Sequence, residues 1–155
     1  MSSTPFDEST VVDSPTEWVN SHIQTYVASD GENGEGFREG VPILLLSVLG
    51  RKSGVWRRTA LIFGRAGDGA DGAYVVVASK GGSPEHPAWY TNLVAEPTVH
   101  VQVKGEKFTA RARTAEGAER AELWVRMAGI WPDYDSYQTK TSREIPVVVL
   151  DRVAD

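Results

Sequence analysis

The chain has 155 residues, and its 16 lysine and arginine residues against 21 aspartate and glutamate residues give a net charge of −5. This length suits one domain with a sizeable core, and the negative charge argues against a general nucleic-acid binder, which needs a broad basic face. Cysteine is absent, which excludes disulfides, zinc–thiolate sites and cysteine nucleophiles.

The N-terminal stretch, residues 1–13, is polar and unpatterned, and we expect it to form a flexible arm before a single domain over residues 14–155. It lacks the basic and apolar regions of a secretory signal, so we expect a cytoplasmic protein. Ser14 and Glu17 have the spacing of a capping box, which predicts a helix over residues 14–29.

Beyond residue 40 the pattern is mainly that of β-strands. The longest apolar stretch, residues 41–49, is too short for a membrane span but suits a fully buried strand, and alternating valines favour a later hairpin with its turn at Gly105–Glu106. The predicted strands cover residues 43–49, 56–63, 73–79, 98–104, 107–113 and 145–150, and further helices cover 87–96, 116–129 and 132–138. This order favours an α+β, mainly β fold, in which about six antiparallel strands close into a small barrel with peripheral helices.

The segment LGRKSGVWRR, residues 49–58, which we call the cationic turn, carries four cations in an acidic protein: Arg51, Lys52, Arg57 and Arg58. One interpretation is a solvated sheet edge, where lysine and arginine prevent aggregation. The other is an anion site, because Ser53 and Gly54 allow hydroxyl and backbone N–H groups to turn toward an anion. Lys80, beside paired glycines at another strand end, adds a further cation. Arginine and lysine suit phosphate and carboxylate, so the second interpretation predicts a small polyanionic ligand.

Aromatic side chains gather in two later segments. Trp89 and Tyr90 are adjacent near the start of a predicted helix, and core packing remains an open alternative for Trp89. Tyr134 and Tyr137 are three positions apart in an otherwise polar segment that would make poor core. A tyrosine offers a flat apolar face and a hydroxyl donor, so this pair favours a pocket around a flat ligand, where a phenol can donate to developing negative charge.

No pattern in the sequence supplies reactive chemistry of its own. The three histidines, His22, His86 and His100, lack metal-ligand spacing, and no G-x-S-x-G motif is present. Neither a metal site nor serine hydrolysis is therefore predicted. A borrowed cofactor is then the natural source of reactivity.

Six short motifs occur in one order along the chain: LGRKSG, VVVASKGG, PAWYTNL, PTVHVQVKGE, WPDYDSYQ and R-x-IPVVVL. With these motifs the chain resembles the deazaflavin (F420)-dependent nitroreductase family from about residue 41 to residue 150. The resemblance implies a split β-barrel fold and coenzyme F420, an 8-hydroxy-5-deazaflavin, as cofactor. This cofactor is polyanionic at one end and flat at the other, and the residues favour both properties independently.

The resemblance also implies roles for individual residues. The cations of the cationic turn would hold the phosphate and poly-glutamyl tail, and three later segments would line the channel and contact the ring. The implied cofactor-binding residues are Arg51, Lys52, Ser53, Arg57, Arg58, Thr59, Ala60, Leu61, Ile62, Val77, Ala78, Ser79, Lys80, Ala88, Trp89, Tyr90, Thr91, Asn92 and Tyr134. The implied catalytic residues are Tyr134, Tyr137 and Ser79, which would orient the acceptor and hydrogen-bond the oxygen that gains charge.

The activity that the resemblance implies is hydride transfer from reduced F420 to a small electron-poor acceptor: a quinone, an enone or a nitroaromatic. Two alternatives stay open, namely an FMN-dependent oxidoreductase of the related split-barrel type and a non-catalytic protein that binds deazaflavin or a fatty acid. Because the N-terminal arm is acidic, we expect at most weak membrane association. We expect no nucleic-acid partner, and a homodimer is one option for the assembly.

Overall fold

The computed structural model describes residues 11–13, 23–24, 27, 42–66 and 73–153, and the statements below concern these residues. The predicted helix over 14–29 lies mostly outside them, although Ile23, Gln24 and Val27 are helical. The side chain of Ile23 is fully buried and belongs to a core cluster, against which Val27 also packs.

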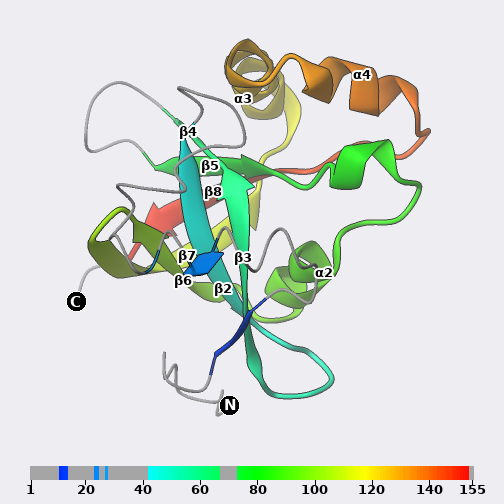
Figure 1. The fold of residues 1–155 in the computed structure, drawn as a ribbon. Coiled ribbons are helices and arrows are strands. Elements are labelled where there is room, and N and C mark those ends of the chain that lie inside the picture. The colour runs from blue at the N-terminus through cyan, green and yellow to red at the C-terminus, as the bar shows by residue number, and fades with distance from the viewer. Residues whose placement is uncertain (1–10, 14–22, 25–26, 28–41, 67–72, 154–155) are drawn as a thin grey trace.

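The strands form one sheet in the order β1-β3-β2-β6-β7-β8-β5-β4 (Figure 1). Neighbouring strands pair antiparallel, except that β1 pairs parallel with β3. The strand bounds are β1 (Val12–Asp13), β2 (Ile43–Leu49), β3 (Trp56–Ile62), β4 (Gly64–Arg65), β5 (Tyr74–Val77), β6 (Thr98–Val103), β7 (Glu106–Thr114) and β8 (Val147–Arg152).

All the predicted strands are present, and no end differs from the prediction by more than two residues. The predicted hairpin turn is wrong by one residue, because Val103 pairs with Glu106 and the turn is therefore Lys104–Gly105. Lys104 has a left-handed φ of 55°. Glycine is the residue that usually marks this conformation, so a lysine did not indicate it in the sequence. The short strands β1 and β4 were not expected, since two residues leave no alternating pattern.

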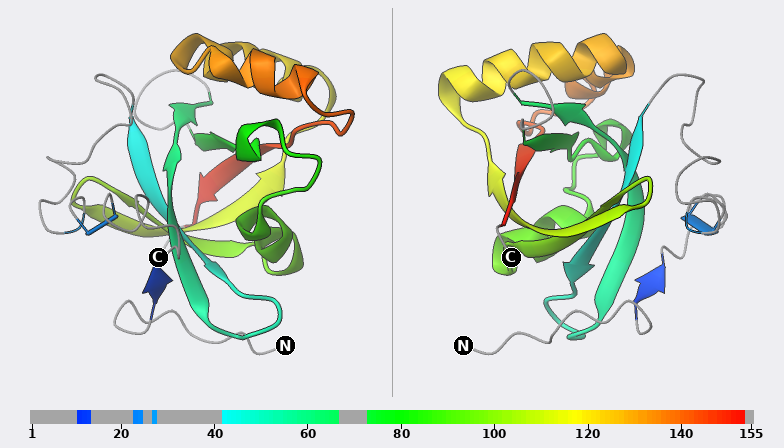
Figure 2. Two further views of the ribbon diagram at one scale, coloured as in Figure 1. Left: turned by 45° about the vertical axis from the view of Figure 1, so that its right-hand side comes forward. Right: turned by 90° about the vertical axis from the view of Figure 1, so that its left-hand side faces the viewer.

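The sheet curls round on itself without closing, which is the open form of a β-barrel (Figure 2). Its hydrogen-bonded order runs from β1 at one edge to β4 at the other. Strands β3 and β5 nevertheless lie close in space. The predicted class, a mainly β fold built as a split barrel with peripheral helices, is thereby confirmed. The expected closure of about six strands is wrong, because the described sheet has eight strands and stays open.

Apart from the helical residues 23, 24 and 27, the described ranges contain one 3₁₀ turn and three α-helices, which lie outside the sheet. The 3₁₀ turn is η2 (Lys80–Gly82), which was not predicted. The α-helices are α2 (Ala88–Ala95), α3 (Gly117–Ile130) and α4 (Asp133–Thr139), and they match the predicted ones within one residue at each end. Figure 1 shows α3 and α4 together at one end of the barrel and α2 at the other. No helix in this part of the chain has both the length and the apolar content that crossing a membrane requires.

Two buried clusters lie on opposite faces of the central strands. Along β2, Ile43 and Leu45 belong to the cluster that α3 and α4 cover, whereas Leu44 and Leu46 belong to the cluster that α2 covers. Alternate side chains of a strand point to opposite faces, so a strand buried on both faces must be apolar throughout. This explains why β2 follows from a continuous apolar run.

Candidate functional site

The predicted site residues lie along one side of the molecule. The cationic turn at the end of the β2–β3 hairpin, helix α2, the loop with η2 and helix α4 follow one another along the right-hand side of Figure 1, and the left view of Figure 2 keeps the same order. Elements that are far apart in the sequence therefore meet on this side.

The cationic turn is closed by its own backbone. The N–H of Gly50 donates to the carbonyl of Val55 at 2.8 Å, and the N–H of Gly54 donates to the carbonyl of Gly50 at 2.9 Å. A Cβ on Gly50 would lie 2.5 Å from Oγ of Ser53, so a side chain at this position would displace the Ser53 hydroxyl. The Ser53 hydroxyl accepts a hydrogen bond from the N–H of Val55 at 3.2 Å and stabilises the same turn.

Three of the predicted cations are exposed at this turn. Arg51 and Lys52 lie in the turn itself, and Arg57 begins the returning strand. The Nε atom of Arg57 lies 3.5 Å from the position that a Cβ on Gly50 would take, so its guanidinium stays beside the turn. These three side chains present concentrated positive charge to solvent.

Arg58 is not brought together with the other three cations. Adjacent residues of a strand point to opposite faces, and Arg58 faces β1. Its Nε donates to Oδ1 of Asp13 at 2.6 Å and its Nη2 donates to Oδ2 at 3.2 Å, with only 10% of the arginine side chain exposed. Sequence reasoning missed this ion pair because β1 is too short to be recognised.

A hydrogen-bonded contact fixes the cationic turn against α2. The amide oxygen Oδ1 of Asn92 accepts from Nη1 of Arg51 at 2.7 Å and from the backbone N–H of Arg51 at 3.2 Å. Asn92 is only 4% exposed, so its side chain is held by packing. Two predicted binding residues that are far apart in the sequence therefore meet directly.

The other predicted site residues of α2 are exposed or half-buried. Ala88 is exposed, whereas Trp89, Tyr90 and Thr91 are half-buried. Trp89 and Tyr90 pack against the cluster that α2 covers. The Tyr90 hydroxyl shares a hydrogen bond of 2.9 Å with the hydroxyl of Thr114 on β7. The half-buried position of Trp89 fits core packing and also fits contact with a ligand, because the residue packs against the cluster and is still partly accessible.

The predicted channel residues come from two strands that lie close together. On β3, Ala60 and Ile62 are buried, and Thr59 and Leu61 are half-buried on the opposite face. At the end of β5, Val77 and Ala78 are buried, Ser79 is half-buried and Lys80 is exposed. Lys80 adopts a left-handed φ of 45°, and its Nζ is 4.0 Å from Oε2 of Glu85.

The two phenols of α4 differ in burial. Tyr134 is 4% exposed and belongs to the core cluster, with its ring centroid 6.3 Å from that of Trp124 and 6.1 Å from that of Tyr137. The expectation that this segment would make poor core is therefore wrong for Tyr134, because the polar residues of the helix point outward. Burial, and then the neighbouring Tyr137, raise the pKa of the Tyr134 phenol well above its ordinary value, so it is neutral at physiological pH.

Tyr137 is half-buried and lies against the loop that contains η2. Its hydroxyl accepts a hydrogen bond from Nε1 of Trp131 at 3.4 Å. A Cβ on Gly82 would lie 2.7 Å from the Tyr137 carbonyl oxygen, so α4 and η2 pack with no space for a side chain at that position. The described histidines and carboxylates form no group of three that could hold a metal ion.

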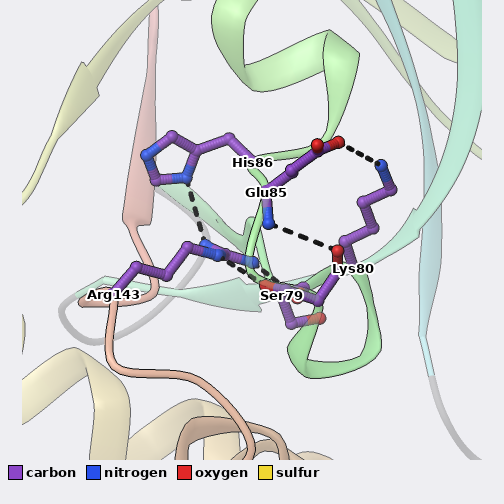
Figure 3. A network of polar contacts seen from close by, with 6 residues as sticks. Ser79, Lys80, Glu85, His86 and Arg143 are labelled. Carbon is purple, nitrogen blue, oxygen red and sulfur yellow. Dashed lines mark hydrogen bonds and ion pairs between the residues drawn. The ribbon is translucent and has the colours of Figure 1, made fainter.

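Arg143 was not among the predicted site residues, yet it is central to this part of the molecule (Figure 3). Its guanidinium donates to the carbonyl oxygens of Ser79 at 2.8 Å, Ser83 at 2.8 Å and Ala78 at 3.2 Å. It also donates to Nδ1 of His86 at 3.1 Å. The signal for it in the sequence was the arginine of the R-x-IPVVVL motif, which precedes the last strand.

The contact with Arg143 favours the neutral form of His86. A guanidinium has donors only, so Nδ1 of His86 accepts in this hydrogen bond. Burial, and then the positive charge of Arg143, lower the pKa of His86 below its ordinary value. The ring also packs against Tyr90, with centroids 4.9 Å apart, which links this loop to α2.

Comparison with known proteins gives consistent matches over most of the chain. A family model described as F420H(2)-dependent quinone reductase matches residues 18–152. An F420H(2)-dependent quinone reductase of Mycobacterium tuberculosis is 40% identical over 134 residues, which cover 84% of this chain and 87% of the relative.

Two solved structures are similar in both sequence and fold. The structure of an F420-H2 dependent reductase, FDR-A, is 44% identical with a TM-score of 0.62, and the match covers 70% of this chain and 93% of that chain. A domain-swapped dimer is 40% identical with a TM-score of 0.64, and the match covers 88% of this chain and 99% of that chain.

Proposed function

The chain belongs to the F420H(2)-dependent quinone reductase family, and on that premise we propose that it reduces a quinone at the expense of reduced F420. It is an oxidoreductase, and its cofactor is coenzyme F420. When bound, reduced F420 supplies the hydride. The quinone gains this hydride and one proton and becomes a hydroquinone, so a pair of electrons moves in one step. Of the acceptors expected from the sequence, the family supports the quinone.

The residues along the site fit such a cofactor. Arg51, Lys52 and Arg57 expose positive charge that suits a phosphate and a carboxylate tail, and Lys80 adds charge further along the same side. Trp89 and Tyr137 offer partly accessible aromatic faces, which suit a flat ring. The cations therefore suit the anionic end of the cofactor, and the aromatic faces suit its planar end.

The hydrogen bond between Arg51 and Asn92 is the observation that carries this proposal. Asn92 takes one N–H of the Arg51 guanidinium and leaves the remaining donors for an anionic ligand. Because the Arg51 backbone donates to the same oxygen, the cationic turn is fixed relative to α2 and Trp89. We infer that the turn binds the tail with its exposed cations and that Ser53 supports the turn. Arg58, which is paired with Asp13, holds β1 against β3 and has a supporting role.

The remaining predicted residues complete the proposed cofactor site as its walls. Exposed and half-buried members contact the cofactor directly, and buried members set the shape of the wall behind them. These residues are Thr59, Ala60, Leu61, Ile62, Val77, Ala78, Ser79, Lys80, Ala88, Trp89, Tyr90, Thr91 and Asn92.

Tyr134, Tyr137 and Ser79 are the proposed catalytic residues. A phenol with a raised pKa donates a hydrogen bond without losing its proton, which suits the quinone oxygen that gains negative charge. The ring of Tyr137 lies beside Tyr134 and restricts how the acceptor can approach. Ser79 is the residue that directly precedes η2, the turn that packs against α4.

The experiment is to follow oxidation of reduced F420 by a panel of quinone, enone and nitroaromatic acceptors. We expect turnover with the quinones, and no turnover when NADPH replaces reduced F420. Quenching of tryptophan fluorescence by F420 but not by FMN would separate this activity from that of an FMN enzyme. Binding of F420 without turnover of any acceptor would contradict the proposal and favour a carrier.

We further propose that the enzyme works in the cytoplasm on a small-molecule acceptor, without nucleic acid and with at most weak membrane association. One structural relative is a domain-swapped dimer, which supports a homodimer as the assembly to test. Light scattering on the purified protein measures the mass of the assembly, and a monomeric mass would contradict this part of the proposal.

A further inference from the structure

The loop of residues 78–87 holds an unusual backbone conformation in front of α2. Lys80 has a left-handed φ of 45°, which is unfavourable for a residue with a side chain, and Gly82 has a φ of 86°. Two backbone hydrogen bonds close the turn, from Gly82 to Ser79 at 2.9 Å and from Ser83 to Lys80 at 3.1 Å. A conformation of this kind persists only when the surroundings hold it in place.

Arg143 is the group that holds this loop. Its planar guanidinium contacts three carbonyl oxygens on either side of Lys80, those of Ala78, Ser79 and Ser83, and the ring nitrogen of His86. Figure 3 shows Arg143 with Ser79 and His86. Four of its N–H groups are therefore used on one short segment, an arrangement that suits the fork geometry of arginine and that lysine cannot reproduce. Within the described part of the chain no carboxylate pairs with Arg143, so no ion pair neutralises the positive charge that it brings to the loop.

The backbone of Arg143 is in turn attached to α4. The side-chain amide of Gln138, on α4, donates to the carbonyl of Arg143 at 2.8 Å, and its oxygen accepts from the N–H of Ile145 at 3.0 Å. The N–H of Arg143 donates to Oγ1 of Thr141 at 3.3 Å. Arg143 thus links the helix that carries Tyr134 and Tyr137 with the turn that carries Ser79 and Lys80.

We propose that Arg143 is a positioning residue that fixes the Ser79–Lys80 turn relative to the phenols of α4 and so aligns the cofactor with the acceptor. This inference rests on the proposed function, because it assigns the turn to the cofactor and the phenols to the acceptor. Arg143 acts through the loop carbonyls and contacts neither partner of the reaction.

The test compares Arg143→Gln and Arg143→Lys with the control Arg126→Gln. Arg126 lies on α3, and its Nη2 is 3.5 Å from Oε1 of Glu122, away from the loop. In the cofactor-free protein, Arg143→Gln should speed amide hydrogen exchange at Gly82 and Ser83 about tenfold, while exchange in the β6–β7 hairpin stays unchanged. The control should leave exchange at both places unchanged.

Binding and turnover give the second readout. For Arg143→Gln we expect the dissociation constant for F420 to rise about tenfold and kcat to fall about tenfold. KM for the quinone should stay unchanged. Arg143→Lys should restore part of both losses, because an ammonium can bind one or two of the carbonyls. If Arg143→Gln does not fold, the lysine variant decides by the same measurements.

The outcomes separate this inference from the proposed function. Wild-type loop exchange, F420 affinity and kcat in a folded Arg143 variant would overturn the positioning role, even if the native protein reduces quinones. Failure of the native protein to oxidise reduced F420 would instead overturn the proposed function, and the exchange experiment would still report whether Arg143 holds the loop.

Discussion

The two ends of the proposed site are built in opposite ways. At the cationic turn, Arg51, Lys52 and Arg57 are exposed, and the hydrogen bonds to Asn92 are the side-chain contacts that fix the turn to α2. At the other end, α4 and residues 78–83, which we call the phenol corner, combine a buried Tyr134 with a guanidinium bound to three carbonyls.

The difference fits the two tasks that such a cofactor sets. A charged tail needs long, adaptable side chains that can follow it, and solvent-exposed arginine and lysine provide them. A hydride and a quinone need a fixed geometry, because small displacements of the reacting groups are costly. On the proposed function, the flexible side chains therefore lie where charge would be bound and the packed ones lie where the chemistry would take place.

The largest effect should come from filling the space at Gly82 in the phenol corner. An alanine there must adopt a φ of 86°, and its Cβ would meet the Tyr137 carbonyl at 2.7 Å. We expect Gly82→Ala to lower the free energy of unfolding by about 3 kcal/mol, from backbone strain and overpacking together. Urea denaturation measures this loss.

Gly117→Ala is the matched control for that substitution. Gly117 has a φ of 59°, but no atom lies within 4 Å of the place that a Cβ would take, so only the backbone strain applies, at about 1 kcal/mol. Equal losses in the two variants would show that the phenol corner is not tightly packed.

Tyr134→Phe should have the next largest effect, and it should act on turnover. Phenylalanine keeps the packing of the buried ring but removes the hydroxyl donor. We expect kcat to fall roughly 100-fold, about 2.7 kcal/mol, while F420 affinity and stability stay nearly unchanged. Tyr74→Phe, a buried tyrosine that stacks on Phe108, is the control and should leave kcat unchanged. A collapse of F420 affinity in Tyr134→Phe would make Tyr134 a cofactor ligand instead.

Asn92→Asp tests the opposite end of the site with a smaller effect. The new carboxylate can still accept from Arg51, but it neutralises the positive charge of the turn and repels an anionic tail. We expect the dissociation constant for F420 to rise about tenfold, or about 1.4 kcal/mol, with little loss of stability.

Asn92→Ala separates the added charge from the lost hydrogen bond. Without a new negative charge, the rise should be only about threefold, and high salt should reduce the loss in the aspartate variant more than in the alanine variant. Identical losses at every salt concentration would argue that the charge of the turn does not bind the tail.

The smallest effect should be the response to acid of His86, which contacts Arg143 beside the phenol corner. Because the folded-state pKa of His86 is lowered, the unfolded chain takes up a proton first, so stability is present above the ordinary value of 6.5 and is lost as the pH falls below it. His86 is exposed, so we expect a loss of only a few tenths of a kcal/mol between about pH 7 and about pH 5. Urea denaturation of His86→Gln, whose amide oxygen can still accept from Arg143, should show a smaller dependence on pH.

The fold could be predicted because its strongest patterns are local. The apolar run of β2 and the alternating valines of β6 identified strands directly, and the helix ends followed from Pro87, Pro97 and Pro132. The hairpin turn was misplaced because Lys104 takes a left-handed backbone that hydrogen bonding across the hairpin imposes. The strand β1 exists only through its pairing with β3, which no local pattern records.

The site could be predicted only in part, because its geometry depends on contacts between distant segments. The clustering of Arg51, Lys52 and Arg57 follows from one short turn, and it was expected. The pairing of Arg58 with Asp13 was not, since it joins two strands across the sheet edge. Arg143 was missed because a single arginine before a strand does not reveal which carbonyls its guanidinium will contact.

The pairing of β2 with β3 also determines where the positive charge of the molecule stands. The two strands pair residue by residue from Ile43 opposite Ile62 to Leu49 opposite Trp56, and the loop they enclose reaches Asn92. Two extra residues in each strand would preserve the inside–outside alternation yet carry the loop about 7 Å onward. The length of the hairpin thus determines how far along the strand direction the cationic turn lies. Changing this length offers a way to redesign which anionic chains the protein can accommodate while every reactive group is kept.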